Sequence, residues 1–189
     1  MTGLKVLSLG GNMFSGSVPG SLRNLTELET LNFGHNNLTG SLPEEIMGLS
    51  NLSTLDLSGN NFSGEISAGI GNLSQVVVLN LSANGFSGKM PTSLGNLFKL
   101  TTLDLSKQKL SGELPLELSV PIPFEVIYRE LLAFFDLRSL VVLSLSNNHV
   151  SGEIPPELGN CTELEVLELG SNSLTGHIPA DLSRLARLK

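Results

Sequence analysis

Residues 28–51 read LETLNFGHNNLTGSLPEEIMGLSN, and this pattern returns with a period of 24 through most of the chain. The repeats begin at Leu4, Leu28, Leu52, Val76 and Leu100 and, after an irregular stretch, at Leu140, Leu164 and Leu188. Their common pattern is LxxLxLxxNxLxGxIPxxLGxLxx. A fixed period of this length indicates a solenoid, in which each unit buries its hydrophobic residues against its neighbours.

The beginning of each repeat predicts a short strand. In LKVLSLG, residues 4–10, Leu7 and Leu9 alternate with Ser8 and Gly10, so the leucines are expected to point inward and the small residues outward. Further leucines close each coil on the opposite side. The LxxLxL core therefore predicts an α/β-type repeat solenoid, a right-handed leucine-rich-repeat superhelix with a parallel concave β-sheet and a convex side of 3-10 or irregular turns.

Three further columns have their own physical roles. An Asn amide after the strand can bond turn groups that would otherwise be buried without partners, and Gln108, one methylene longer, should do this less well. A glycine column indicates a close approach or an unusual φ, and the prolines suit an extended segment. The columns are Asn12, Asn36, Asn60, Asn84, Asn148 and Asn172; Gly16, Gly40, Gly64, Gly88, Gly112, Gly152 and Gly176; and Pro19, Pro43, Pro91, Pro115, Pro155 and Pro179, with Ser67 as the gap.

The composition narrows the functional classes. Hydrophobic residues make up 40% of the 189 residues and aromatic residues 5%, which is typical of an aliphatic, layered core. A net charge of −7 argues against nucleic-acid binding, which requires a positive surface. The sequence has neither an apolar run of about 18 residues nor a signal-peptide pattern, so we expect no membrane insertion by the chain itself.

Four segments carry a more specific resemblance. LTGSLPEEIMGL (38–49), FSGEISAGIGNL (62–73), VSGEIPPELGNC (150–161) and LTGHIPADLSRL (174–185) resemble the plant-specific type of leucine-rich repeat. Such repeats form the extracellular domains of plant leucine-rich-repeat receptor-like kinases and receptor-like proteins. The resemblance implies a non-catalytic module in a ligand-sensing ectodomain, on the extracellular side of the plasma membrane. It implies a peptide, protein or glycan ligand, a co-receptor and no cofactor, and any Ser/Thr kinase domain of the parent receptor is absent from this chain.

The residues between the paired strand leucines form the candidate binding strip. They are polar and slightly acidic, and small residues flank them, so a ligand on the concave face could form hydrogen bonds with them. The candidates are Asn32, Asp56, Asn80, Asp104, Ser144 and Glu168. The alternative is that this strip is a solvated framework, which the absence of aromatic and Arg anchors favours.

The resemblance also implies glycosylation, for which the chain has seven N-x-S/T sequons, at Asn24, Asn37, Asn51, Asn61, Asn72, Asn80 and Asn160. Asn37 and Asn61 arise from the repeat pattern itself, and Asn80 lies on the candidate strip. The preferred candidates are Asn24, Asn72 and Asn160 on the far side.

Catalytic and metal sites are not indicated. His35, His149 and His177 share no column and lack metal-ligand spacing, so we interpret them as solvated. Cys161 occupies a leucine position and is expected to be a small buried hydrophobe. No phosphate-binding loop or set of kinase motifs is present, and the chain is predicted not to be an enzyme.

The stretch VPIPFEVIYRELLAFFDL, residues 120–137, interrupts the pattern. The interval from Gly112 to Gly152 is sixteen positions longer than one period and eight shorter than two. One hypothesis is an inserted amphipathic helix that binds a partner. The other, favoured because both flanks stay in register with their repeats, is a junction of two partial repeats, with the solenoid broken or strained between residues 119 and 139.

The predicted organisation has three parts. Residues 1–118 hold repeats 1–5, residues 119–139 form the irregular interruption with a possible short helix, and residues 140–189 continue the repeats and are truncated at the C-terminus. Two other interpretations stay open. The chain could be a truncated or structural array fragment without independent function, or an intracellular leucine-rich-repeat scaffold.

Overall fold

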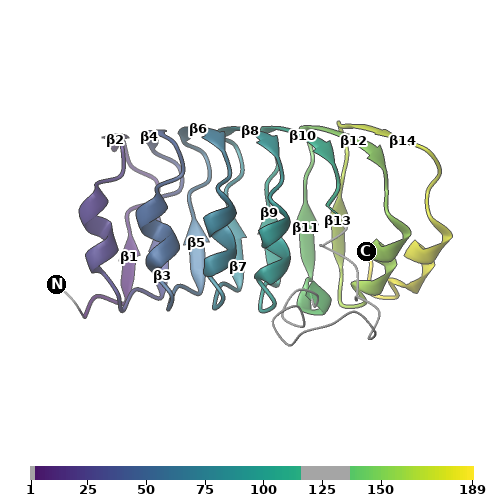
Figure 1. Ribbon diagram of the computed structural model, residues 1–189, viewed down its shortest axis with the longest axis horizontal. Helices are drawn as coiled ribbons and strands as arrows, with labels where there is room; N and C mark the ends of the chain where they lie inside the picture. Colours follow the sequence, from purple (N-terminus) through teal and green to yellow (C-terminus); the bar gives the residue numbers. More distant parts are fainter. Residues whose placement is uncertain (1–2, 116–136) are drawn as a thin grey trace.

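The computed structural model describes residues 3–115 and 137–189. Successive coils stack side by side into an elongated array, with the first coil at one end and the last at the other (Figure 1). Each coil contributes a strand to one parallel sheet, a strand to a second parallel sheet and a short 3-10 helix. The predicted repeat solenoid with a parallel sheet and 3-10 turns is confirmed.

The first sheet contains the predicted strands. Except between β9 and β11, each residue pairs with the residue one period later, as Thr54 does with Val78 and Asp56 with Asn80. The order of the seven strands follows the chain without a crossover. They are β1 (Val6–Ser8), β3 (Thr30–Asn32), β5 (Thr54–Asp56), β7 (Val78–Asn80), β9 (Thr102–Asp104), β11 (Val142–Ser144) and β13 (Val166–Glu168).

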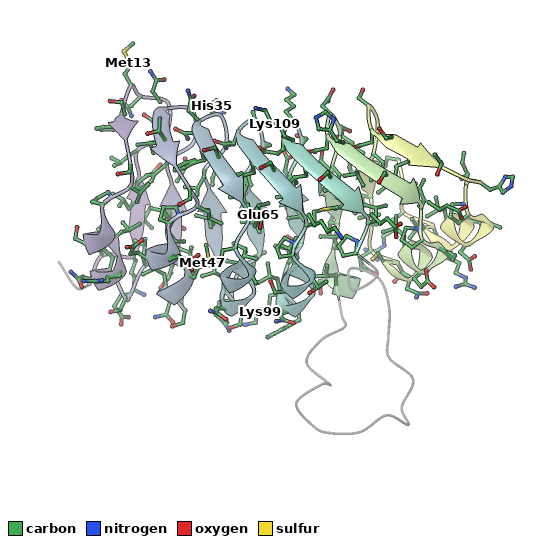
Figure 2. The ribbon with its side chains drawn as sticks, turned by 45° about the horizontal axis from the view of Figure 1, so that its top comes forward. Met13, His35, Met47, Glu65, Lys99 and Lys109 are labelled. Atoms are coloured by element: carbon green, nitrogen blue, oxygen red, sulfur yellow. The ribbon has the colours of Figure 1, made fainter. Side chains whose placement is uncertain are left out.

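The second sheet was not predicted. It also has seven parallel strands, and Figure 2 turns them toward the reader, with Glu65 and Lys109 labelled. Its pairing is shifted by two residues relative to the repeat, so Glu65 faces Ser87 and Ser87 faces Lys109. The strands are β2 (Ser15–Gly16), β4 (Asn37–Gly40), β6 (Asn61–Glu65), β8 (Gly85–Lys89), β10 (Lys109–Glu113), β12 (His149–Glu153) and β14 (Ser173–Thr175).

Five of the described 3-10 helices begin directly after a residue of the proline column. Proline fits this position because its fixed φ suits the extended residue before the turn, and Pro43 has φ −66°. At Ser67, which replaces proline, the hydroxyl oxygen accepts a hydrogen bond of 3.1 Å from Gly69 N instead. The helices are η1 (Gly20–Asn24), η2 (Glu44–Gly48), η3 (Ala68–Asn72), η4 (Thr92–Asn96), η7 (Leu137–Ser139), η8 (Pro156–Asn160) and η9 (Ala180–Arg184).

A continuous, mainly aliphatic core runs between the two sheets and the helices, and it also contains the stacked rings of Phe62 and Phe86. Leu55, Leu79 and Leu103, the central leucines of three strands, are completely buried. The end coils are more open, since Phe14 is 48% exposed and Ile178 82% exposed. This gradient is what a solenoid requires, because each coil buries its hydrophobic residues only against its neighbours.

The Asn column bonds the turns, as predicted. Asn60 is buried, and its Nδ2 donates to Phe33 O at 2.9 Å and to Leu57 O at 3.1 Å, while its Oδ1 accepts from Leu38 N at 2.9 Å. Gln108 keeps the bonds that reach the neighbouring coil. Within the described residues it makes no bond to the carbonyls of its own turn, which every Asn of the column makes, so the prediction that it does this less well is confirmed.

The glycine column has a positive φ in every coil, as at Gly64 with φ 84° and Gly152 with φ 81°. From Gly88 onward these glycines also allow a close approach, because a Cβ at Gly152, for example, would lie 2.8 Å from Glu113 Cγ. The residue before the Asn column has a positive φ as well, at Ala83 and Lys107 for example. Sequence reasoning missed this second position because residues other than glycine occupy it in most coils.

The two sheets continue across the interruption. β9 pairs directly with β11, Thr102 with Val142, and β10 pairs with β12. Leu110 N also donates to Asn148 Oδ1 at 3.0 Å, the bond that other coils make to their next Asn. The expected break in the sheet is therefore wrong for the described strands, which advance by a single coil between Thr102 and Val142. The predicted helix at residues 124–135 and residues 119–136 of the proposed irregular unit lie outside the described residues.

Candidate functional site

The outward face of the first sheet is built from three columns that run along the solenoid. The middle column, which we call the polar ladder, contains all six predicted site residues in one continuous register: Ser8, Asn32, Asp56, Asn80, Asp104, Ser144 and Glu168. On one side lies the β-branched column of Val6, Thr30, Thr54, Val78, Thr102, Val142 and Val166. On the other side lies the small column of Gly10, Gly34, Ser58, Ser82, Ser106, Ser146 and Gly170.

Four ladder side chains, those of Asn32, Asp56, Asn80 and Asp104, bond the backbone two residues further along. Asp56 Oδ1 accepts from Ser58 N at 2.9 Å and from Ser58 Oγ at 2.7 Å. Asn32 and Asp104 make the same backbone bond, each at 2.9 Å. These Asx-type turns fix the orientation of each side chain as the strand ends. One oxygen is therefore occupied by the fold, while the rest of each polar group faces outward.

The small column makes room for these side chains. A Cβ at Gly34 would lie 3.0 Å from Asp56 Oδ1, and a Cβ at Gly10 would lie 2.7 Å from Asn32 Oδ1. Asn32 and Asp56 thus lean toward the glycine of the preceding coil. Glycine at positions 10 and 34 is explained by that contact, so its small size has a structural cause there.

The ladder is acidic and its C-terminal part is also hydrogen-bonded from strand to strand. Ser144 Oγ donates to Glu168 Oε2 at 2.7 Å, across the β11–β13 pair. Asp56 and Asp104 are half-buried and Glu168 is exposed. Two basic side chains close in sequence, His35 and Lys107, lie in the turns beyond the small column. The face can accept hydrogen bonds and attract cationic groups.

Ion pairs join neighbouring coils at the start of the first sheet. Lys5 Nζ lies 2.7 Å from Glu29 Oε1, and this hydrogen bond and the charge of Glu29 raise the pKa of the Lys5 ammonium. At the other end, the hydrogen bond from Lys189 and its charge lower the pKa of the Glu165 carboxyl. Both pairs are exposed, so they contribute little to stability.

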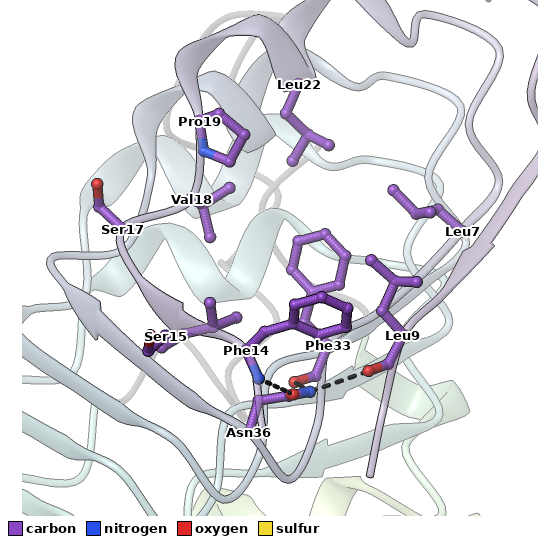
Figure 3. A pocket seen from close by; sticks show the side chains of 11 residues that line it. Leu7, Leu9, Phe14, Ser15, Ser17, Val18, Pro19, Leu22, Phe33 and Asn36 are labelled. Atoms are coloured by element: carbon purple, nitrogen blue, oxygen red, sulfur yellow. Dashed lines mark hydrogen bonds between the residues drawn. The ribbon is translucent and has the colours of Figure 1, made fainter. Parts of the chain in front are cut away.

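An apolar hollow of about 280 Å³ lies at the first coil (Figure 3). Its lining includes Leu7, Leu9, Phe14 and Phe33, and the bonds from Phe14 N to Asn36 Oδ1 and from Asn36 Nδ2 to Leu9 O run along one side. In later coils the preceding coil covers the equivalent surface. The hollow is therefore an open part of the core and lacks the convergent polar groups of a small-molecule site.

The predicted glycosylation candidates lie at the ends of 3-10 helices. Asn24 and Asn72 are exposed, and Asn160 is half-buried. Asn37 and Asn61 are exposed on the second sheet, so exposure alone does not separate them from the preferred three. The assignment stays a prediction.

The remaining residues singled out in the sequence have simple structural settings. His35, His149 and His177 are exposed, and Cys161 is buried with 3% exposure, as predicted. Within residues 3–115 and 137–189, no three His, Cys, Asp or Glu side chains gather where they could hold a metal ion. No helix in those same ranges has the length and apolar character needed to cross a bilayer.

Comparison with known proteins agrees with this geometry. Family models described as leucine rich repeat, leucine rich repeats (2 copies) and leucine rich repeat match residues 2–62, 138–180, and 75–97 with 99–120, respectively. No curated protein matches the chain. The chain belongs to the leucine-rich repeat family.

Solved structures narrow the resemblance to plant receptor ectodomains. The plant peptide hormone receptor RGFR1 in complex with RGF2 is 32% identical, with a TM-score of 0.87 over 98% of this chain and 27% of that one. The Arabidopsis receptor kinase HAESA in complex with the peptide hormone IDA and the co-receptor SERK1 is 40% identical, with a TM-score of 0.81 over 95% of this chain and 27% of that one. A TDR receptor is 34% identical, with a TM-score of 0.74 over 98% and 33%. The chain spans about a quarter to a third of the length of these three structures.

Proposed function

We propose that the chain is a non-catalytic recognition module, part of the ligand-sensing ectodomain of a plant leucine-rich-repeat receptor, and that the first sheet binds a peptide or protein ligand. The observation that carries this proposal is the unbroken polar ladder. It places Asn32, Asp56, Asn80, Asp104, Ser144 and Glu168 in one row. The first four are oriented by bonds to the turn that follows, and Ser144 and Glu168 are bonded to each other across the strands.

The names of the similar structures support the same role. RGFR1 and HAESA are both described in complex with peptide hormones, and HAESA also with a co-receptor. By this likeness we assign the chain to the extracellular side of the plasma membrane, with a co-receptor as a second partner and with glycans at Asn24, Asn72 and Asn160. Mass spectrometry of the chain secreted from plant cells tests the three glycan sites directly. If none of the three asparagines carries a glycan, the proposed glycosylation is wrong.

The main experiment is a selection of peptides that bind the full chain from a displayed random library. Binders that use the first sheet should be lost with Asn80→Arg, because a long charged side chain at the centre of the ladder blocks the row. Ser63→Arg, on an exposed position of the second sheet, is the matched control and should leave binding unchanged. Binders that are equally sensitive to both variants, or insensitive to Asn80→Arg, would contradict the proposed face.

A structural spacer is the competing role, and one observation favours it. The ladder oxygens already serve the turns, as Asp104 Oδ1 does for Ser106 N, so these residues have a reason to be polar without any ligand. If the library yields no peptide that depends on the first sheet, the spacer is the better description.

A further inference from the structure

The carboxylates of the polar ladder occupy every second coil. Asp56, Asp104 and Glu168 are acidic, and Asn80 and Ser144 between them are neutral. The alternation is not regular in the sequence, where the interval from Asp104 to Glu168 is sixteen positions longer than the interval from Asp56 to Asp104. It becomes regular because β9 pairs directly with β11, so both intervals equal two strand spacings.

The spacing excludes a single shared cation. Parallel strands lie about 4.8 Å apart, so the strands that carry successive carboxylates are about 9.6 Å apart. The ligands of one metal ion lie within about 2.6 Å of it, which this separation does not allow. It also exceeds the Debye length of about 8 Å at physiological salt, so repulsion between the carboxylates is small. The face presents three separate anionic groups on evenly spaced strands, and the Glu168 carboxylate reaches toward Ser144 of the neighbouring strand.

Each carboxylate is held by the fold through one oxygen. Ser58 bonds Asp56 Oδ1, Ser106 N bonds Asp104 Oδ1, and Ser144 bonds Glu168 Oε2. Among the described residues, no hydrogen bond or ion pair engages the second oxygen of these three groups. A carboxylate that is oriented before binding loses less conformational freedom when a ligand binds. This arrangement therefore favours a ligand whose cationic groups have the same spacing as the carboxylates.

The spacing selects one backbone conformation for an extended ligand that runs along the solenoid. A polyproline II helix repeats every three residues at about 3.1 Å per residue, or about 9.3 Å per turn and 18.6 Å over two turns. The strands that carry the three carboxylates span about 19.2 Å. A β-strand places same-side residues about 6.7 Å apart, which does not match, and an α-helix with a seven-residue repeat reaches about 21 Å over two repeats.

The flanking columns fit the same ligand. The β-branched column provides methyl groups at Thr54, Val78 and Thr102, against which proline rings can pack, and these side chains are half-buried. On the other side of the ladder, the small column has short side chains or none, so the backbone of a ligand can approach the sheet there. The three columns together therefore form an apolar strip, an anionic row and a strip without bulky side chains.

We propose that the first sheet binds a polyproline II peptide carrying lysine or arginine at every third position, with three consecutive basic residues on Asp56, Asp104 and Glu168. The proposal rests on the function proposed above, since it names the ligand class for the same face. It also requires coils on both sides of the interruption, because two of the carboxylates precede residue 116 and one follows residue 136.

The test compares two labelled proline peptides of identical composition, PKPPKPPKP and PPKPKPKPP, by fluorescence anisotropy with the full chain. The first places lysines three residues apart and the second two apart. The first should bind about tenfold more tightly, equivalent to about 1.4 kcal/mol, because only it can engage all three carboxylates in register. Equal affinities would overturn the proposal, since a diffuse acidic face would attract both alike.

Two triple variants complete the test. Asp56→Asn, Asp104→Asn and Glu168→Gln together should weaken PKPPKPPKP at least about tenfold. Asn32 and Asn80 already make the same turn bonds as the aspartates, so this variant should keep the fold. The control, with the same change in net charge, is Glu65→Gln, Glu113→Gln and Glu153→Gln on the second sheet. Retained binding in the first variant, or equal losses in both, would contradict the proposal.

The library selection described above separates the two levels of the hypothesis. If its peptides depend on Asn80 but lack a basic residue at every third position, the first sheet is a recognition face and only the ligand class proposed here is wrong. If no peptide depends on Asn80, both the face and the ligand class are wrong.

Discussion

At the scale of single residues, hydrogen bonding by the Asn column explains why an amide is needed once per coil. Asn60 joins its own turn to the preceding coil, through Phe33 O and Leu38 N. The sequence predicted this role because a buried turn must bond its backbone groups. It did not predict that Asp56 and Asn80 would each use one oxygen in a turn. The sequence pattern of an outward polar residue is the same whether or not its side chain makes that bond.

Replacing Asn60 by Ala should destabilise the protein by about 3 kcal/mol, because the change leaves a buried N–H and buried carbonyls without partners. Asn61, the next residue, is exposed, and Asn61→Ala should change stability by less than about 0.5 kcal/mol. Thermal unfolding followed by circular dichroism measures both. Similar losses from the two variants would show that the buried bonds of Asn60 do not control stability.

At the scale of elements, the two sheets differ in how well the sequence predicts them. The first sheet follows from alternating leucines. The second consists largely of serine, threonine, glycine and charged residues, as in β8 with GFSGK, and glycine in particular has low strand propensity. These strands form because each coil lies against the next, and backbone hydrogen bonds between neighbouring coils hold them in the extended conformation. The sequence of a single repeat contains no pattern that predicts these bonds.

The position before the 3-10 helices, which is proline for five of them and Ser67 for η3, provides the element-scale prediction. Ser67→Ala should cost about 1 kcal/mol, because Gly69 N loses the hydroxyl that caps η3. Ser67→Pro should stay within about 0.5 kcal/mol of the original chain, since the lost cap is offset by a more restricted unfolded state. Ser41→Ala, at an exposed serine, serves as the control for both. Thermal midpoints decide, and a proline variant less stable than the alanine variant would contradict this account.

At the scale of the whole molecule, the interruption leaves the array continuous. Sequence arithmetic allowed sixteen extra residues or eight missing ones, and only strand pairing distinguishes them. The pairing of Thr102 with Val142 gives one coil with sixteen extra residues. Leu137 confirms this description, because it is buried with 4% exposure and its carbonyl accepts from Leu140 N, as the carbonyl of Leu97 does from Leu100 N.

Deleting residues 119–134 should therefore leave a folded protein. The deletion joins Leu118 to Phe135 and restores the interval between Gly112 and Gly152 to one repeat period. We expect the thermal midpoint to be equal or higher, because closing a shorter connection costs up to about 1 kcal/mol less. Deleting residues 119–137 instead also removes the buried Leu137 and should cost about 2–5 kcal/mol. If the first deletion unfolds the protein, the sixteen residues belong to the structure of the coil.

The two-residue shift of the second sheet has a consequence for how such arrays can be altered. On the first sheet, equivalent repeat positions lie side by side. Adding or exchanging a whole coil therefore keeps the side chains of one repeat position in a straight row across the strands. On the second sheet, a line across the strands passes from Glu65 to Ser87 to Lys109, which are three different repeat positions. A change made at one position of every repeat therefore produces a straight line on one side of the molecule and a diagonal on the other.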